Sequence, residues 1–345
     1  MRIHDFNQRL TQLGANPRHL GRIRRAWLKG SPLDDGRKAQ QAETFLPRRV
    51  REGLPEVQRE LDALAQVHAH HPAADGSARL LVKLNDGQMI ESVLLPRDGL
   101  CVSTQVGCAV GCVFCMTGRS GLLRQVSSGE IVAQVALARR MRPVKKVVFM
   151  GMGEPAHNLD NVLEAIELLG TDGGIGHKNL VFSTVGDMRV FERLPTQRVK
   201  PALALSLHTT DAALREKLLP KAPRIAPARL VELGEDYARR VGHPIQYQWT
   251  LLEGINDNQD ELDGLLRLLS GKYAVLNLIP YNSLDGDDYR RPTGERIVHM
   301  VRYLHSRGIL TKVRNSAGQD IEGGCGQLRA RAQAEQIIDT RALRR

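Results

Sequence analysis

The sequence predicts an α/β protein, with a partial (β/α)6 barrel as its core and a small, mostly helical N-terminal accessory domain. Six short apolar runs with the length of buried parallel strands recur between residues 100 and 279. Amphipathic helical patterns lie between these runs. Because six strand–helix units are too few for a closed eight-stranded barrel, we expect an incomplete one.

Three parts of the chain are distinguished by composition. The accessory domain is predicted over residues 1–90, where breaks rich in Gly, Pro and Asp at 30–32 and 71–76 interrupt a mostly helical stretch. The catalytic core is predicted over 91–330, and a basic tail follows over 331–345.

Individual elements follow from local signals. A β-hairpin that leads into the core is expected over 78–95, around the turn Asn85-Asp86-Gly87. The capping box of Ser127 and Glu130 begins a helix that runs towards Pro143. The predicted barrel strands cover 100–106, 146–150, 180–184, 202–207, 245–251 and 275–279. Two further helices have apolar faces at i, i+3, i+4 and i+7, formed by Leu262, Leu265, Leu266 and Leu269, and by Ile297, Met300, Val301 and Leu304.

The net charge of +11 is concentrated near the N-terminus, where residues 17–51 hold ten Lys or Arg and only three acidic residues. Such a concentration indicates a surface that binds nucleic-acid phosphates, although a solvated helical face gives the same pattern. Aromatic residues are only 4% of the chain, so backbone contacts are expected to dominate over base stacking. The ten residues are Arg18, Arg22, Arg24, Arg25, Lys29, Arg37, Lys38, Arg48, Arg49 and Arg51.

The compartment is predicted from two further features. The sequence has no run of eighteen apolar residues, and its first residues have none of the features of a secretory leader. We therefore expect a cytoplasmic protein without membrane contact, whose five cysteines are kept reduced for a metal cluster.

Three of the five cysteines, Cys108, Cys112 and Cys115, form a C-x3-C-x2-C motif. Thiolates at this spacing are typical ligands of a [4Fe-4S] cluster that leaves one iron open to a small molecule. A structural zinc site and a group of buried thiols are the alternatives. Zinc prefers four protein ligands, and neither Cys101 nor Cys325 has the paired companion typical of such sites.

Polar and glycine-rich motifs follow four of the predicted strands, at the edge where barrel active sites lie. In the run 150–155 (Met-Gly-Met-Gly-Glu-Pro), two glycines allow close approach of a ligand, and the carboxylate of Glu154 can accept from an ammonium group. An ordinary β–α turn is the alternative for this run. Ser183, His208 and Asn282 could equally be satisfied polar residues at strand ends.

Several short blocks occur in an order that resembles the radical S-adenosylmethionine (SAM) RNA methyltransferases of the RlmN/Cfr family. The resemblance covers about residues 91–328. It implies a radical SAM barrel with a [4Fe-4S] cluster and SAM as cofactors, and a SAM pocket lined by Gly153, Glu154, Ser183, Ser206, Leu207, His208 and Asn282. The blocks are Cys101-Val102-Ser103-Thr104-Gln105-Val106-Gly107-Cys108, Met150-Gly151-Met152-Gly153-Glu154-Pro155, Ser206-Leu207-His208, Pro280-Tyr281-Asn282 and Cys325-Gly326-Gln327-Leu328.

The resemblance also implies roles for the residues outside the cluster motif. One SAM methylates Cys325, and a radical formed from a second SAM takes a hydrogen from that methyl group. The methylene radical then adds to the adenine, which joins the RNA to Cys325. Glu91 matches the general base that removes the proton, and Cys101 matches the thiol that releases the product by forming a disulfide with Cys325. For Glu91, a strand glutamate that faces solvent is the alternative.

The substrate is predicted less closely than the chemistry. The N-terminal region and residues 116–124 depart from the family pattern where substrate choice is set, so the sequence does not choose between ribosomal and transfer RNA. Within the family the C8 activity is a specialised offshoot, so C2 is favoured over C8. The family implies an electron donor such as a flavodoxin or ferredoxin, and we expect a monomer. The alternatives are a radical SAM enzyme with a non-RNA substrate and a non-catalytic RNA-binding protein with a structural metal.

Overall fold

The fold was obtained as a computed structural model of the whole chain. The structure describes residues 1–34, 45–283, 286–315, 326, 327, 329 and 330. Cys325, Arg37, Lys38 and the predicted basic tail lie outside the described residues.

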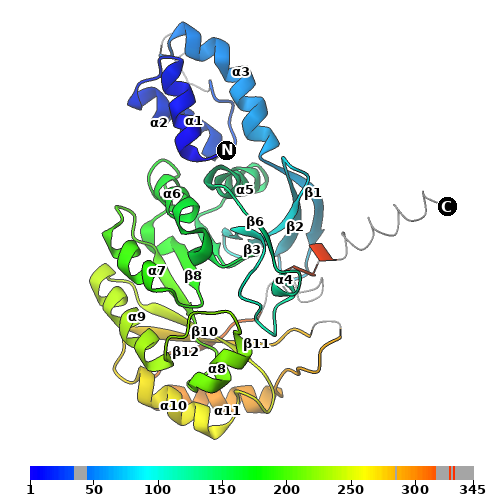
Figure 1. The fold of residues 1–345 in the computed structure, drawn as a ribbon, viewed down its shortest axis with the longest axis vertical. Helices are drawn as coiled ribbons and strands as arrows, with labels where there is room; N and C mark the ends of the chain where they lie inside the picture. Colours follow the sequence, from blue (N-terminus) through cyan, green and yellow to red (C-terminus); the bar gives the residue numbers. More distant parts are fainter. Residues whose placement is uncertain (35–44, 284–285, 316–325, 328, 331–345) are drawn as a thin grey trace, which may run out of the picture.

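Three helices form the N-terminal part, which lies at one end of the long axis in Figure 1. They are α1 (Ile3–Gln12), α2 (Pro17–Lys29) and α3 (Arg48–Ala63). Helix α2 begins where the Asn16 side chain accepts from two backbone N–H groups, and it ends at Gly30, whose φ of 70° favours glycine. Phe6 and Trp27 pack between α1 and α2 with ring centroids 5.8 Å apart. These helices share one hydrophobic core with the outer layer of the barrel.

A ten-stranded sheet forms the body of the protein, in the order β1-β2-β3-β4-β7-β8-β9-β10-β11-β12. The first four strands are antiparallel, and β4 to β12 are parallel. The hairpin predicted over 78–95 is confirmed as β2 and β3. The strands are β1 (Ala65–Pro72), β2 (Ala78–Leu84), β3 (Met89–Leu95), β4 (Gly99–Cys101), β7 (Lys146–Phe149), β8 (Leu180–Thr184), β9 (Ala202–Ser206), β10 (Ile245–Leu251), β11 (Ala274–Pro280) and β12 (Thr311–Val313).

The barrel helices cover one face of the parallel strands. Helix α5 begins at the predicted capping box, where Ser127 accepts from the Glu130 N–H. The two predicted apolar helical faces are confirmed in α10 and α11. The helices are α5 (Ser128–Met141), α6 (Leu159–Gly170), α7 (Met188–Arg193), α8 (Ala212–Leu218), α9 (Pro227–Val241), α10 (Gln259–Leu269) and α11 (Gly294–His305), with 3-10 turns at Pro155–Asn158, His177–Asn179 and Leu194–Thr196.

Side chains of the parallel strands alternate between two faces. Those of the outer face are large and apolar, such as Phe149, Phe182 and Trp249, and pack against the helices. The inner face instead carries small residues and a thiol. This inner cluster consists of Val93, Cys101, Val148, Val181, Ala202 and Ala204.

The structure corrects three sequence expectations of the fold. The first predicted strand, 100–106, is divided between β4 and a separate two-stranded sheet of β5 (Gln105–Gly107) and β6 (Leu122–Gln125). The short strand β12 makes the parallel array one strand longer than predicted. Residues 65–72, expected in a mostly helical region, form strand β1. The barrel itself is confirmed, whereas the domain boundary at residue 90 stays a prediction.

No helix in the described part of the chain is both long enough and apolar enough to cross a membrane.

Candidate active site

The three motif cysteines lie in the loop that joins β5 and β6. Gly107, with φ of 81°, begins this loop, and a Cβ atom there would collide with the carbonyl oxygen of Gly121. The N–H of Cys108 donates to the same oxygen over 2.9 Å, and the N–H of Cys115 donates to the oxygen of Cys112 over 3.1 Å. Backbone constraints therefore hold the three half-buried thiols on one short loop.

The thiols interact electrostatically, which fits a shared iron–sulfur cluster. Burial, together with the charge of Cys115, raises the pKa of Cys108 to about 12. Burial, followed by the charges of Cys115 and Cys108, raises the pKa of Cys112. Iron supplies the positive charge that three thiolates here require. In the described residues, no three His, Cys or acidic side chains are grouped so that they could hold one metal ion. A [4Fe-4S] cluster does not require such a grouping, because each of the three thiolates binds a different iron atom.

Gly153 and Glu154 lie directly beyond β7 and next to β5. Gly153 has φ of 102°, and a side chain there would overlap Gln105, whose amide oxygen accepts from the Glu154 N–H over 2.7 Å. The Glu154 carboxylate accepts from the N–H groups of Ala156 and Val185, each over 3.0 Å. Burial raises the pKa of Glu154 to about 7 despite these bonds. The carboxylate therefore stabilises the turn after β7 through backbone hydrogen bonds. The sequence had predicted only a contact with an ammonium group of a ligand.

Ser183 and Ser206 share the inner face of the sheet, but Leu207 does not. Ser183 pairs in register with Ala204, and Ser206 ends β9 two residues later. The Leu207 side chain is fully buried in the outer core, so only its backbone is placed to contact a ligand inside the barrel. Asn282 follows β11 and is half-buried.

His208 connects the end of β9 to the cluster loop. It has a left-handed backbone, with φ of 62°, and its ring makes an edge contact with Phe114 at 4.7 Å between centroids. Nδ1 accepts from the N–H of Thr250 over 2.9 Å. Burial, together with the charge of Arg215, lowers the pKa of His208 to about 3. The imidazole is therefore neutral at ordinary pH.

Glu91 is a buried residue of β3, so the alternative of a solvent-facing glutamate is wrong. Its side chain and that of Arg79 are each 2% exposed, and they form an ion pair at 3.2 Å. The other carboxylate oxygen accepts from the backbone N–H of Arg329 over 3.0 Å. Sequence reasoning missed Arg79 because it is not even the register partner of Glu91, which is Leu81; Arg79 pairs with Val93 and reaches Glu91 diagonally.

Cys101 ends β4 on the inner face, where it pairs in register with Val93 and Val148. Burial lowers the pKa of Arg314, and a negative charge on Cys101 acts in the opposite direction. Arg314 follows the last parallel strand, so residues at the two ends of the parallel array are close enough to interact electrostatically. This proximity of a thiol and a guanidinium was not expected from the sequence.

Although Cys325 lies outside the described residues, its neighbour Gly326 is described. Gly326 has φ of 91°, and a Cβ atom there would lie 2.7 Å from the Thr117 hydroxyl oxygen. Thr117 belongs to α4 (Met116–Arg119), which begins directly after Cys115. The residue after Cys325 therefore packs beside the cluster loop.

The basic N-terminal segment is partly committed to intramolecular contacts. Arg24 and Arg25 both pair with Asp172 of the barrel, over 2.7 and 2.8 Å. The guanidinium of Arg22 lies 3.3 Å from the centre of the Phe45 ring. These three arginines therefore already have partners within the protein. The exposed cations of the segment, such as Arg18, Lys29 and Arg49, are better placed to bind phosphates.

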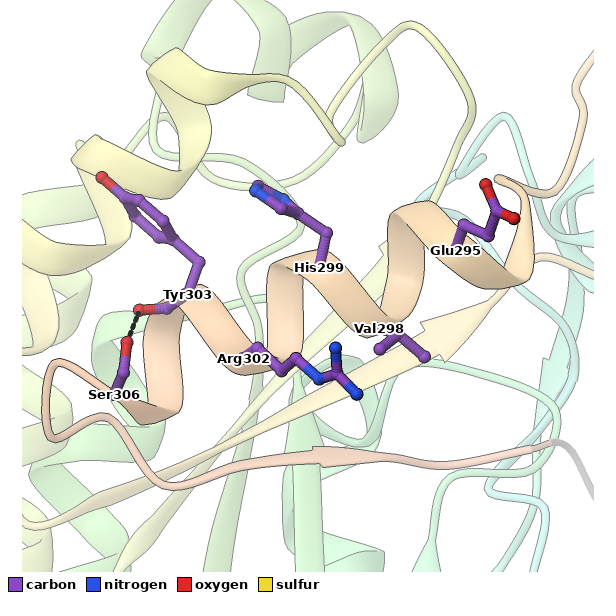
Figure 2. A pocket seen from close by; sticks show the side chains of 6 residues that line it. All are labelled: Glu295, Val298, His299, Arg302, Tyr303 and Ser306. Carbon is purple, nitrogen blue, oxygen red and sulfur yellow. Dashed lines mark hydrogen bonds between the residues drawn. The ribbon is translucent and has the colours of Figure 1, made fainter.

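A surface hollow of about 460 Å³ lies on the outer side of the barrel, away from these residues. Figure 2 shows that its lining side chains come from α11 and its C-cap residue Ser306, and that Val298 and Arg302 extend to one side while His299 and Tyr303 extend to the other. The hollow is thus the exposed surface of a single helix and is separate from the candidate site.

Comparison with known proteins identifies the family. Residues 102–269 match the family model described as the radical SAM superfamily. A radical SAM methyltransferase from Sphaerobacter thermophilus has a structure that superposes with a TM-score of 0.79 at 32% identity, over 95% of this chain and 97% of that one. The chain belongs to the radical SAM superfamily.

Two curated relatives extend this result to the full length. A probable RNA methyltransferase of Stutzerimonas stutzeri is 80% identical over 96% of this chain and 97% of its own length. One from Chromobacterium violaceum is 70% identical over 100% and 97%. This radical SAM protein is therefore a methyltransferase, with a [4Fe-4S] cluster and SAM as cofactors. The alternative of a non-catalytic binding protein is wrong.

Proposed function

We propose that the protein methylates a carbon atom of an adenine in ribosomal or transfer RNA, with C2 favoured over C8, through a methyl group carried on Cys325. Relatives that match almost the whole chain are named probable RNA methyltransferases, which supports RNA as the substrate. The exposed cations of the N-terminal helices and a flavodoxin or ferredoxin as electron donor complete the proposal.

The position of the reacting carbon explains the need for radical chemistry. C2 and C8 of adenine are electron-poor and cannot attack a methyl group directly. When bound, the cluster and SAM supply a carbon radical that removes hydrogen from a methyl group. In this proposal, Cys325 carries that methyl group, and Cys101 later displaces the product by attack on the sulfur of Cys325.

The observation that supports this proposal most directly is the hydrogen bond between Arg329 and Glu91. It connects the segment that follows Cys325 to β3, the strand that pairs with the strand of Cys101. Gly326 packs beside the loop of the motif cysteines. The segments of all proposed catalytic residues therefore converge on one region, as a covalent relay requires.

Glu91 is proposed as the base that takes the proton from the substituted carbon. Arg79 compensates its buried charge, while Oε1 is occupied by the Arg329 N–H. Each carboxylate oxygen has two lone pairs, so Glu91 can keep both contacts and still accept a proton from the substrate. In this proposal, the hydrogen bond between Glu91 and Arg329 forms only when the segment that follows Cys325 is in place.

The test is mass mapping of methylated adenines in RNA from a strain that lacks the protein. We expect one adenine of ribosomal or transfer RNA to lose a methyl group, and the purified protein to restore it in vitro with SAM and a reductant. A complete set of methyl groups in the RNA of the deletion strain would contradict the proposal and leave a non-RNA substrate.

A further inference from the structure

Two amide side chains lie next to each other on the inner face of the barrel with unused hydrogen-bonding atoms. Gln248 of β10 and Asn277 of β11 are register partners, and each is 3% exposed. Gln248 Nε2 donates to the backbone oxygen of Gln246 over 3.3 Å, which fixes Oε1 as the free atom. Among the described residues, Gln248 Oε1 and Asn277 Nδ2 have no hydrogen-bond partner.

The two free atoms are an acceptor and a donor. A buried polar atom without a partner destabilises a fold, so such pairs are typical of binding sites rather than of packing. The edge of an adenine presents the complementary pair, an amino group beside a ring nitrogen that accepts. Enzymes that act on an unstacked base commonly read it by hydrogen bonds of this kind.

Cations continue this row of side chains. Lys312 of β12 is the register partner of Asn277, and Arg314 lies two residues further along the same face. Near the other end of the parallel array, Lys146 begins β7, the neighbour of β4, and lies on the same face as Val148. Burial lowers the pKa of Lys146, and the charges of Arg314, Arg97 and Lys312 lower it further. The positive charges are therefore close enough to repel one another, and an anion would offset that repulsion.

Adenine occurs both in the RNA substrate and in SAM. Phosphate distinguishes the two, because SAM has none and each nucleotide of RNA has one. Position in the sheet does not separate them, because Gln248 is also the register partner of Ser206, one of the residues expected to bind SAM. The row of cations also reaches Arg314, the residue near Cys101.

We propose that Gln248 and Asn277 read the adenine edge of the target nucleotide in RNA, and that Lys312 and Arg314 hold its phosphate. This inference rests on the proposed function and assigns the substrate subsite within it. The nucleotide would lie between the amide pair and Cys101, the thiol that acts on the covalent product.

The test replaces each amide by an apolar side chain of similar size, in Gln248→Met and Asn277→Leu. Each change should lower kcat/KM for RNA methylation about 10- to 100-fold, the usual effect of losing base-reading contacts. The thermal midpoint should stay equal or rise, because each change removes a buried atom that has no partner. The RNA is the unmethylated fraction from the deletion strain.

Gln246→Met is the matched control, since Gln246 lies on the same strand and face two residues earlier and is only half-buried. It should methylate RNA at close to the normal rate. Lys312→Gln and Arg314→Gln should each reduce the salt dependence of RNA binding by about one unit, as expected for a lost phosphate contact.

A second measurement separates the two sources of adenine. The dissociation constants of SAM and of adenosine 5′-monophosphate are measured for the wild-type holoenzyme and both amide variants. Weaker binding of the monophosphate, with a smaller change for SAM, supports the RNA subsite. Loss of SAM affinity alone would assign the amides to SAM and overturn the proposal.

Normal RNA methylation by Gln248→Met and Asn277→Leu would also overturn it while leaving the proposed function intact. If the wild-type protein methylated no RNA, the proposed function itself would fail.

Discussion

The backbone N–H of Arg329 donates to Oε1 of Glu91 over 3.0 Å, although the two residues are 238 positions apart in the chain. The other carboxylate oxygen is paired with Arg79 in the adjacent strand. One buried carboxylate therefore joins the hairpin before the barrel to a residue of the segment that follows Cys325. Figure 1 shows β2 and β3 on the side of the molecule where the described C-terminal residues lie.

Removal of Arg79 should destabilise the protein strongly. Arg79→Met leaves the Glu91 charge buried without its guanidinium, which typically lowers the free energy of unfolding by about 3–5 kcal/mol. The double variant Arg79→Met with Glu91→Met should recover most of this loss, because an apolar pair needs no compensation. Urea unfolding of the anaerobic holoprotein measures both.

Lys83→Met is the control for Arg79→Met, because Lys83 is an exposed residue of the same strand. Its effect should stay within about 0.5 kcal/mol. A double variant as unstable as Arg79→Met alone would show that the ion pair is not what stabilises this hairpin.

Loss of one cluster cysteine should abolish both iron binding and SAM cleavage. Cys112→Ala removes one of three thiolate ligands, so the purified protein should lose its iron and its reductive cleavage of SAM. Iron and sulfide content, with the visible absorbance of the anaerobic protein, measure the first effect. Cys101→Ala is the matched thiol control and should keep its iron. Full SAM cleavage by Cys112→Ala would rule the cluster assignment out.

Binding to RNA should depend on exposed cations rather than on the paired arginines of α2. Changing Arg18, Lys29 and Arg49 to Gln should weaken binding to all RNAs alike and reduce the slope of log K against log salt by up to about 0.9 per lost contact. A triple change of Lys178, Lys217 and Arg240 on the barrel matches it in charge. Equal slopes for the two triple variants would favour the solvated-face interpretation.

The sequence predicted those parts of the site that local patterns determine. The spacing of Cys108, Cys112 and Cys115 requires no knowledge of the fold, and the Ser127–Glu130 capping box acts within one helical turn. Six parallel strands were recognisable because burial on both faces makes them continuous apolar runs.

What the sequence could not predict depends on contacts between distant segments. Strand β12 has three residues, too few for an apolar run, and it is defined only by its pairing with β11. Strand β1 is mostly exposed beyond Ala65, so it has no hydrophobic signal. Arg24 was interpreted as a phosphate ligand because its partner, Asp172, is 148 positions away. Gln248 and Asn277 became visible as a pair only once the register was known.

His208 should make the stability depend on pH. Its pKa is lowered in the fold from 6.5 to about 3, so below pH 6.5 the unfolded chain binds a proton that the folded one does not. The stability that His208 contributes is therefore complete above pH 6.5 and falls by about 1.4 kcal/mol per pH unit below it.

The comparison for His208 is His208→Asn, because Asn tolerates positive φ and its amide oxygen can accept from Thr250 without titrating. The free energy of unfolding of the wild type, relative to this variant, should decrease by about 2 kcal/mol between pH 6.5 and 5. His70→Asn, at an exposed position of β1, should show no such trend. A constant difference between wild type and His208→Asn would contradict the buried neutral imidazole.

The two cysteines outside the cluster motif should fail in opposite ways. Cys325→Ala has no sulfur to carry the methyl group and should form no bond to RNA. Cys101→Ala should accept the methyl group on Cys325, react once and stall, because no thiol attacks the sulfur of Cys325 to release the product. Denaturing electrophoresis should show RNA attached to Cys101→Ala, in a band that nuclease removes. The double variant should show none. Normal turnover by Cys101→Ala without an adduct would mean that another group releases the product.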